Sequence, residues 1–196
     1  MADFPKNHPL GDLEALIGQH SHAGPGPAAI TIYIRPLPVC AQLFASKGNE
    51  SKLASKLKLK STPGLATDTK SFTALPLSPG QWMLMGKAKS PDFAREMAKK
   101  TKGLGYISQQ ADSRICLRVS GPMARQLMAR GCRLDLHASN TGAGFCAQTN
   151  MAQIGVIIHQ LDDHPTYDLY LYSGFARSFF HWLSHTAEQF GYEVTI

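Results

Sequence analysis

Residues 113–131 read SRICLRVSGPMARQLMARG and hold the clearest local signal in the chain, a strand that runs directly into a helix. The apolar run 115–119 is typical of a strand. Residues 120–122, Ser-Gly-Pro, predict an N-terminal cap at Ser120 and a proline near the first helical position. Gly131 then ends the helix. The apolar side of this helix is formed by Ala124, Leu127 and Met128.

Downstream of this stretch, the sequence predicts three strands and a final helix. The strands cover 146–152, 155–161 and 167–172, and residues 162–165, Asp-Asp-His-Pro, make the turn between the last two. The helix covers 174–191 and carries a wide aromatic stripe, which is typical of a core-facing side. The stripe consists of Phe175, Phe179, Trp182, Leu183 and Phe190.

Upstream, short helices again alternate with strands. The run 28–34 is rich in β-branched residues and predicts a strand, and 81–86 predicts another after the turn at 78–80. A helix is expected over 51–58, and a second one opens at Pro91 with Ser90 as its N-cap and ends at Gly103. This alternation predicts an α+β fold of mixed, largely antiparallel sheets with packed helices.

The domain organisation follows from composition. Residues 1–27 are polar and rich in glycine and proline, so we expect an N-terminal arm with one short helix near 12–18. Residues 28–196 are expected to form a single domain. The 196 residues are 43% apolar, as in globular proteins, but only 17% charged, which suggests that part of the surface is covered by a partner.

The sequence contains no apolar run long enough for a membrane helix, and its N-terminus lacks the apolar core of a secretory signal. We therefore expect a cytoplasmic protein that does not bind a membrane.

Positive charge is concentrated in one segment. Residues 47–102 hold 12 basic and 4 acidic residues, a net of +8, within a chain of net +6. Lys52, Lys56 and Lys60 are four apart, a spacing typical of a solvated helix face. Aromatic residues do not interleave with them, so no nucleic-acid partner is expected. The alternative reading is an acidic partner protein, which these lysines would steer electrostatically.

A search for reactive groups gives no convincing active site. The four cysteines, Cys40, Cys116, Cys132 and Cys146, form no CxxC pair, which argues against structural zinc, and we expect free thiols. The sequence holds no G-x-S-x-G, Walker or G-x-G-x-x-G motif. We therefore predict no catalytic, cofactor-binding or metal-binding residues in this chain.

Three pairs of polar residues have spacings that bear on that prediction. His181 and His185 have the spacing of two zinc ligands, but Trp182 stands where a metalloprotease needs a glutamate, so solvent-side histidines are expected. Asp162 and Asp163 are interpreted as turn formers. Asp135 and His137 lie two apart and would need Cys132 or Cys146 as nucleophile to form a triad.

Several segments together resemble the gamma subunit of heterotetrameric sarcosine oxidase. They are 113–122 (SRICLRVSGP), 129–137 (ARGCRLDLH), 145–149 (FCAQT), 168–170 (DLY) and 178–183 (SFFHWL), in that order and spacing. The loop 138–141, Ala-Ser-Asn-Thr, departs from the family, where a proline and an aromatic residue are expected.

The resemblance implies a fold similar to part of the aminomethyltransferase (T-protein) folate-binding fold. It also implies a complex that oxidises sarcosine to glycine and yields hydrogen peroxide and methylene-tetrahydrofolate. FAD, FMN, NAD and tetrahydrofolate are expected in the partner subunits, and the gamma subunit carries no known catalytic residues. Its partners would be the alpha, beta and delta subunits, with alpha in direct contact.

Two readings of the function therefore stay open. The first is a non-catalytic subunit that stabilises the complex by docking on the large subunit through Trp82, the N-terminal arm or the loop 137–144. The alternative is a stand-alone folate-binding enzyme or repair factor of the T-protein superfamily. The signature of the related iron–sulfur-assembly proteins, KGCYxGQE, is not reproduced by the nearest pieces, 130–133 (RGCR) and 146–148 (CAQ).

Overall fold

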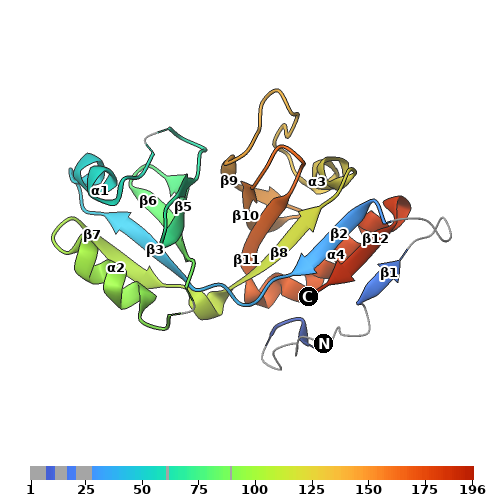
Figure 1. Ribbon diagram of the computed structural model, residues 1–196, viewed down its shortest axis with the longest axis horizontal. Coiled ribbons are helices and arrows are strands. Elements are labelled where there is room, and N and C mark those ends of the chain that lie inside the picture. The colour runs from blue at the N-terminus through green and yellow to red at the C-terminus, as the bar shows by residue number, and fades with distance from the viewer. Residues whose placement is uncertain (1–7, 12–16, 21–27, 61, 89) are drawn as a thin grey trace. The chain divides into compact units, whose positions relative to one another are not determined.

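The computed structural model describes residues 8–11, 17–20, 28–60, 62–88 and 90–196, and these form two compact units (Figure 1). The seven-stranded unit consists of the described part of Met1–Leu37 with Ser113–Ala143 and Gln148–Ile196. The five-stranded unit consists of Pro38–Asp112 and Gly144–Ala147. Each unit has its own sheet and its own pair of helices.

The first unit is built on a sheet of strand order β1-β12-β2-β8-β11-β10-β9. Neighbours are antiparallel except β12 and β2, which are parallel and pair Tyr192 with Ile30. The strands are β1 (Gly18–His20), β2 (Ile30–Ile34), β8 (Arg114–Ser120), β9 (Cys146–Met151), β10 (Ile154–Gln160), β11 (Tyr167–Tyr172) and β12 (Tyr192–Thr195).

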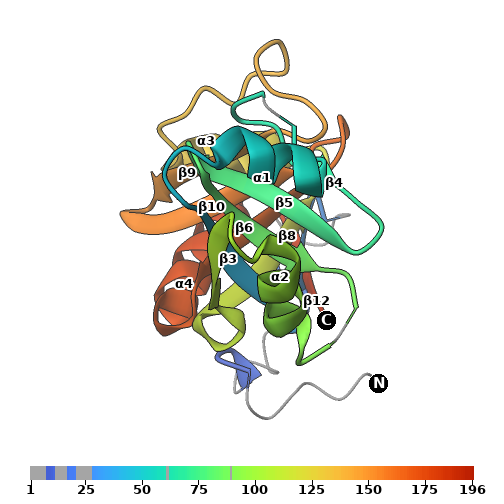
Figure 2. The same ribbon diagram turned by 90° about the vertical axis from the view of Figure 1, so that its left-hand side faces the viewer.

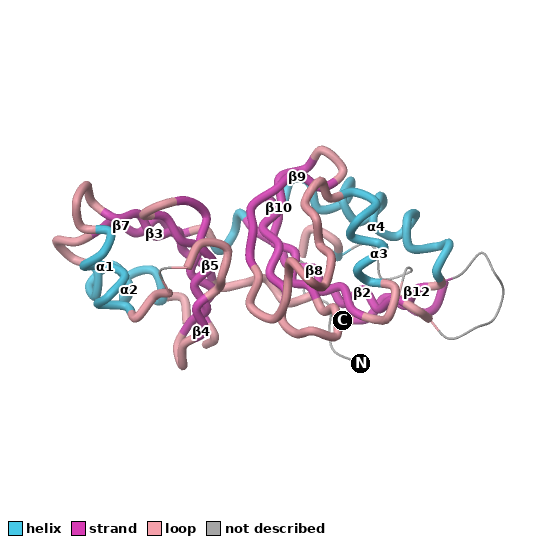
Figure 3. Tube along the Cα trace, turned by 90° about the horizontal axis from the view of Figure 1, so that it is seen from above, coloured by secondary structure: helices cyan, strands magenta, loops and turns pink. Residues whose placement is uncertain are grey.

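Two helices, α3 (Ala124–Gly131) and α4 (Ala176–Ala187), lie on the same side of this sheet (Figure 3). Alternate residues along a strand point to opposite faces. Every second residue of the central strands is apolar and fully buried, as are Leu127 of α3 and Phe179 of α4. This face holds the core of the unit. Its strand residues include Ile30, Ile32, Ile115, Leu117, Val119, Leu169 and Leu171.

The five-stranded sheet has the order β4-β5-β6-β3-β7 and is antiparallel throughout. Helices α1 (Glu50–Leu57) and α2 (Phe93–Thr101) lie over one of its faces (Figure 2). Leu53 and Met97 are buried there together with Leu43 and Leu84 of the sheet. The strands are β3 (Cys40–Ala45), β4 (Thr67–Asp68), β5 (Phe72–Ser78), β6 (Gln81–Gly86) and β7 (Gly105–Gln109).

The predicted fold class is confirmed, since helices pack on two largely antiparallel sheets. The helices expected over 51–58 and 174–191 are present, the latter as α4 with a 3₁₀ turn at each end, η3 (Ser173–Phe175) and η4 (Glu188–Phe190). A third 3₁₀ turn, η2 (Ala111–Ser113), precedes β8. The single-domain prediction for 28–196 stays a prediction.

The predicted helix caps were wrong. Helices α2 and α3 begin at Phe93 and Ala124, and their N-cap residues, Asp92 and Met123, make no side-chain cap hydrogen bond. Ser90 and Ser120 lie before the helices instead, because each proline that follows them belongs to a turn that precedes the first helical residue.

The expected N-terminal arm is described only in part. The helix expected near 12–18 falls largely outside the described residues, and Gly18 belongs to β1. Leu10 is fully buried, and β1 pairs with β12 in the sheet. Within the described part of the chain, no helix is long and apolar enough to cross a membrane.

Candidate functional site

A strip of polar residues runs across the face of the seven-stranded sheet opposite to the buried apolar one. Its centre is an ion pair between neighbouring strands, in which Arg118 of β8 is the register partner of Asp168 of β11. Nε of Arg118 donates to Oδ1 of Asp168 at 2.7 Å, and a second guanidinium nitrogen donates to Oδ2 at 2.9 Å. The Tyr170 hydroxyl donates a longer bond of 3.4 Å to the same carboxylate.

The electrostatics of this strip keep the Arg118 side chain protonated and the Tyr170 and Cys116 side chains neutral. The hydrogen bond to Asp168 raises the pKa of Arg118, and burial raises the pKa of Tyr170 and of Cys116. Both carboxylate oxygens of Asp168 accept from Arg118, so this carboxylate has no oxygen free of a donor. The strip is therefore built to hold two strands together rather than to move a proton.

The thiols are poor nucleophiles in this structure. None of the four cysteines forms a disulfide; Cys40, Cys116 and Cys146 are buried and Cys132 is half-buried. Burial raises the pKa of Cys132, and it raises that of Cys146 to about 12. Because the thiolate is the reactive form, these shifts argue against a catalytic cysteine. The interpretation of Cys116 as a core residue is confirmed, since it is 3% exposed.

Asp135 and His137 do come together, but not as two members of a triad. The Asp135 carboxylate accepts from the backbone N–H of His137 at 2.9 Å and from the Asn140 amide. The His137 ring instead lies 2.8 Å from the Ser139 hydroxyl. These bonds lie within one exposed loop, and they lower the pKa of Asp135. The arrangement is that of a loop fastened by its own side chains.

The two histidines of α4 and the aspartates of the turn 162–165 lie where the sequence predicts. His181 and His185 are exposed on α4, and His185 lies beside Glu188. Asp162 accepts from the backbone N–H of Thr166, as a turn former does. Among the described residues, no three His, Cys, Asp or Glu side chains gather in a way that could hold a metal ion.

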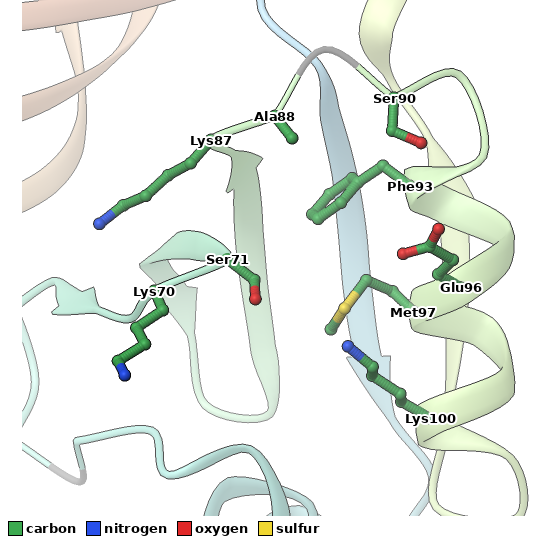
Figure 4. A pocket seen from close by; sticks show the side chains of 9 residues that line it. All are labelled: Lys70, Ser71, Lys87, Ala88, Ser90, Phe93, Glu96, Met97 and Lys100. Atoms are coloured by element: carbon green, nitrogen blue, oxygen red, sulfur yellow. The ribbon is translucent and has the colours of Figure 1, made fainter.

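The five-stranded unit also carries a surface hollow whose lining is rich in lysine. It consists of two adjoining cavities of about 410 and 820 Å³ that share Lys70, Ser71, Lys87 and Lys100. We call it the lysine hollow. Figure 4 shows Lys70 and Lys87 across from Phe93, Met97 and Lys100 of α2. Its five lysines are Lys56, Lys58, Lys70, Lys87 and Lys100.

Charge in the lysine hollow is only partly neutralised. All five lysines are exposed, against two lining carboxylates, Asp68 and Glu96, which leaves a net of +3. The Asp68 carboxylate lies 2.8 Å from Nζ of Lys87. Sequence analysis found the basic segment but not the hollow, because the lysines come from α1, the β4–β5 turn, the end of β6 and α2.

One of the three suggested contact regions was wrong. Trp82 is 8% exposed and belongs to the core of the five-stranded unit, so it cannot serve as a contact residue. The loop 137–144 is largely exposed, as a contact loop would be. The Arg118–Asp168 pair was missed, although a single charge within each of two apolar strands is a recognisable signal.

Comparison with known proteins finds likeness at the level of structure. No protein-family model matches the sequence, and no curated protein matches it. A chain of the heterotetrameric sarcosine oxidase from Corynebacterium sp. U-96, in complex with pyrrole 2-carboxylate, superposes with a TM-score of 0.79 at 20% identity. The match covers 94% of this chain and 95% of that one. The chain has the fold of a sarcosine oxidase chain.

A second solved structure shows the same fold within a larger protein. The glycine cleavage system aminomethyltransferase T from Bartonella henselae matches with a TM-score of 0.69 at 14% identity. The match covers 95% of this chain but only 58% of the aminomethyltransferase. The resemblance expected from the sequence is therefore confirmed for the fold.

Proposed function

We propose that this chain is the gamma subunit of a heterotetrameric sarcosine oxidase and that it serves the complex without catalysing a step itself. The observation that carries the proposal is the match over nearly the whole length of both chains. A chain of a multisubunit oxidase therefore corresponds to this one end to end, whereas the aminomethyltransferase extends well beyond it.

The complex would demethylate sarcosine oxidatively to glycine, with formation of hydrogen peroxide and methylene-tetrahydrofolate, in the cytoplasm. FAD, FMN, NAD and tetrahydrofolate would be held by the partner subunits. This chain would dock on the alpha subunit and stabilise the assembly, which also contains beta and delta subunits. The raised pKa values of Cys132 and Cys146 and the fully engaged carboxylate of Asp168 support a role without chemistry.

One observation supports the expectation that this chain itself holds no folate. A pterin ring presents adjacent N–H donors, which a carboxylate accepts well. Asp168 is the one buried carboxylate among the residues with described positions, and both of its oxygens already accept from Arg118. The fold alone favours the alternative of a stand-alone folate-binding one-carbon enzyme or repair factor.

Co-purification from the native host tests the proposal. We expect larger flavin-containing chains to purify with this one, and the complex to oxidise sarcosine while the isolated chain does not. Turnover of sarcosine by the isolated chain would contradict the proposal. Tight binding of tetrahydrofolate to the isolated chain, measured by calorimetry, would favour the alternative.

A further inference from the structure

We propose that the lysine hollow is a docking site for an acidic polypeptide segment of a partner subunit. The inference rests on the proposed function, because it names the surface and the partner chemistry of an assembly role. Lysines from four separate places in the chain meet at this hollow, from Lys56 at the end of α1 to Lys100 on α2.

The charge of the hollow is the first argument. Like charges that gather on one surface repel, so the arrangement is unfavourable until opposite charge arrives. Lys87 has Asp68 as a partner within the unit. No ion pair with a described carboxylate is formed by Lys56, Lys58, Lys70 or Lys100. These four lysines are therefore available to carboxylates from another chain.

The shape and lining of the hollow argue for a polypeptide over a small molecule. Small-ligand sites are mostly apolar and enclose most of their ligand. Here the lysines are exposed, and the apolar groups beneath them, Phe72, Phe93 and Met97, are 5%, 7% and 1% exposed. A segment lying across the hollow reaches the ammonium groups, whereas these three side chains are too deeply buried to enclose a small molecule.

The same lining argues against nucleic acid. Single strands bind through exposed aromatic side chains on which bases stack, and Phe72 and Phe93 are buried. Arginine is the residue best suited to bidentate phosphate binding, and the residues that line the hollow include lysine but no arginine. Lysines act as point charges that suit the carboxylates of glutamate and aspartate.

Two charge-reversed forms of the full chain test the docking site. The hollow variant is Lys70→Glu with Lys100→Glu, and the control is Lys47→Glu with Lys102→Glu, which changes exposed lysines outside the lining. Each variant replaces two lysines by glutamates, so both lower the net charge from +6 to +2. Bulk electrostatics therefore affects the two alike.

The first measurement is fluorescence anisotropy with a labelled oligoglutamate peptide at low and moderate salt. We expect the hollow variant to lose about tenfold in affinity and the control less than about threefold. Equal losses in both variants would overturn the proposal. Tighter binding of a single-stranded oligonucleotide or of polyphosphate by the same lysines would also overturn it, in favour of a phosphate-bearing ligand.

The second measurement is co-purification of each variant with the flavin-containing chains. We expect the hollow variant to be retained much less than the wild type and the control. Equal retention of all three would refute the docking site while the proposed function stands. If the wild type retains no flavin-containing chain, the proposed function fails, and the docking site in a partner subunit fails with it.

Discussion

The two units place their charged residues differently. The seven-stranded unit holds 8 basic against 9 acidic residues, a net of −1, and Arg118 and Asp168 form an ion pair between two of its strands. The five-stranded unit holds 12 basic against 5 acidic residues, a net of +7, and the lysines that the structure describes in it lie at the surface. In the seven-stranded unit, charged side chains stabilise the pairing of two strands. In the five-stranded unit, the exposed lysines contribute little to stability and are available to bind an acidic partner.

The largest loss of unfolding free energy is expected from a substitution in the seven-stranded unit that changes backbone geometry and leaves charge unchanged. Gly121 has φ +114°, and a Cβ there would lie 2.4 Å from the carbonyl oxygen of Ala29. We expect Gly121→Ala to cost about 4 kcal/mol of unfolding free energy, from strain and displaced backbone together. Urea denaturation followed by circular dichroism measures this cost.

A matched glycine in the five-stranded unit is the control. Gly103 also has a positive φ, +79°, but a Cβ there meets nothing within 4 Å. Gly103→Ala should cost only about 1 kcal/mol. Similar losses for both variants would show that the close approach at Ala29 contributes nothing.

The next effect comes from breaking the buried ion pair. Asp168→Asn leaves the half-buried Arg118 without its counter-charge, and we expect a loss of about 3 kcal/mol. A double-mutant cycle with Arg118→Met isolates the pair, because the second change should cost little once the first is made. Additive losses in thermal denaturation would mean that the two residues do not act as a pair.

A pH-dependent loss of stability is expected from Cys146, the first residue of β9. Burial raises the pKa of Cys146 from 9.0 to about 12 in the folded chain, so the folded state holds this proton more tightly than the unfolded state. The stabilisation is complete below pH 9 and is lost as the pH rises from 9 to 12. Roughly 2 kcal/mol should disappear by about pH 11.

Chemical denaturation across this pH range checks the effect of the thiol. Cys146→Ala should flatten the dependence of the unfolding free energy on pH. Cys132→Ala should change it less, because Cys132 is only half-buried. A slope that Cys146→Ala leaves unchanged would assign the loss to other groups.

The smallest effect is expected for the exposed ion pair of the five-stranded unit. Lys87 and Asp68 are 42% and 70% exposed and lie 2.8 Å apart. Lys87→Met should change the unfolding free energy by less than about 1 kcal/mol. If Lys87→Met lowered the unfolding free energy as much as Asp168→Asn does, the exposed ion pair would stabilise its unit as strongly as the buried one, and the two units would not differ in this respect.

The elements that sequence reasoning predicted are those whose signal is local. The strand–helix step at 113–131 and the hairpin of β10 and β11 carry their own periodicity and turn residues. β5 (Phe72–Ser78) is not among the strands predicted from the sequence, because Pro76 interrupts its pattern. The proline is tolerated because β4 pairs with β5 at Thr73 and Ala74, and Pro76 lies beyond that pairing.

The candidate sites were less predictable because they depend on contacts distant in sequence. Arg118 and Asp168 are 50 residues apart, and no spacing rule connects them. Lys56 and Lys100 are 44 residues apart and share a hollow only because α1 and α2 cover the same sheet face. The sequence shows that the segment 47–102 is rich in lysine. It does not show which of these lysines line the same hollow.

The pairing of β12 with β2 has a consequence for how the protein is made. Ile30 leaves the ribosome 162 residues before Tyr192, its partner in the parallel ladder. Until Tyr192 has been synthesised, the backbone donors and acceptors along one edge of β2 have no strand to pair with. We therefore expect refolding in the test tube to be slow, as for other sheets closed by distant segments.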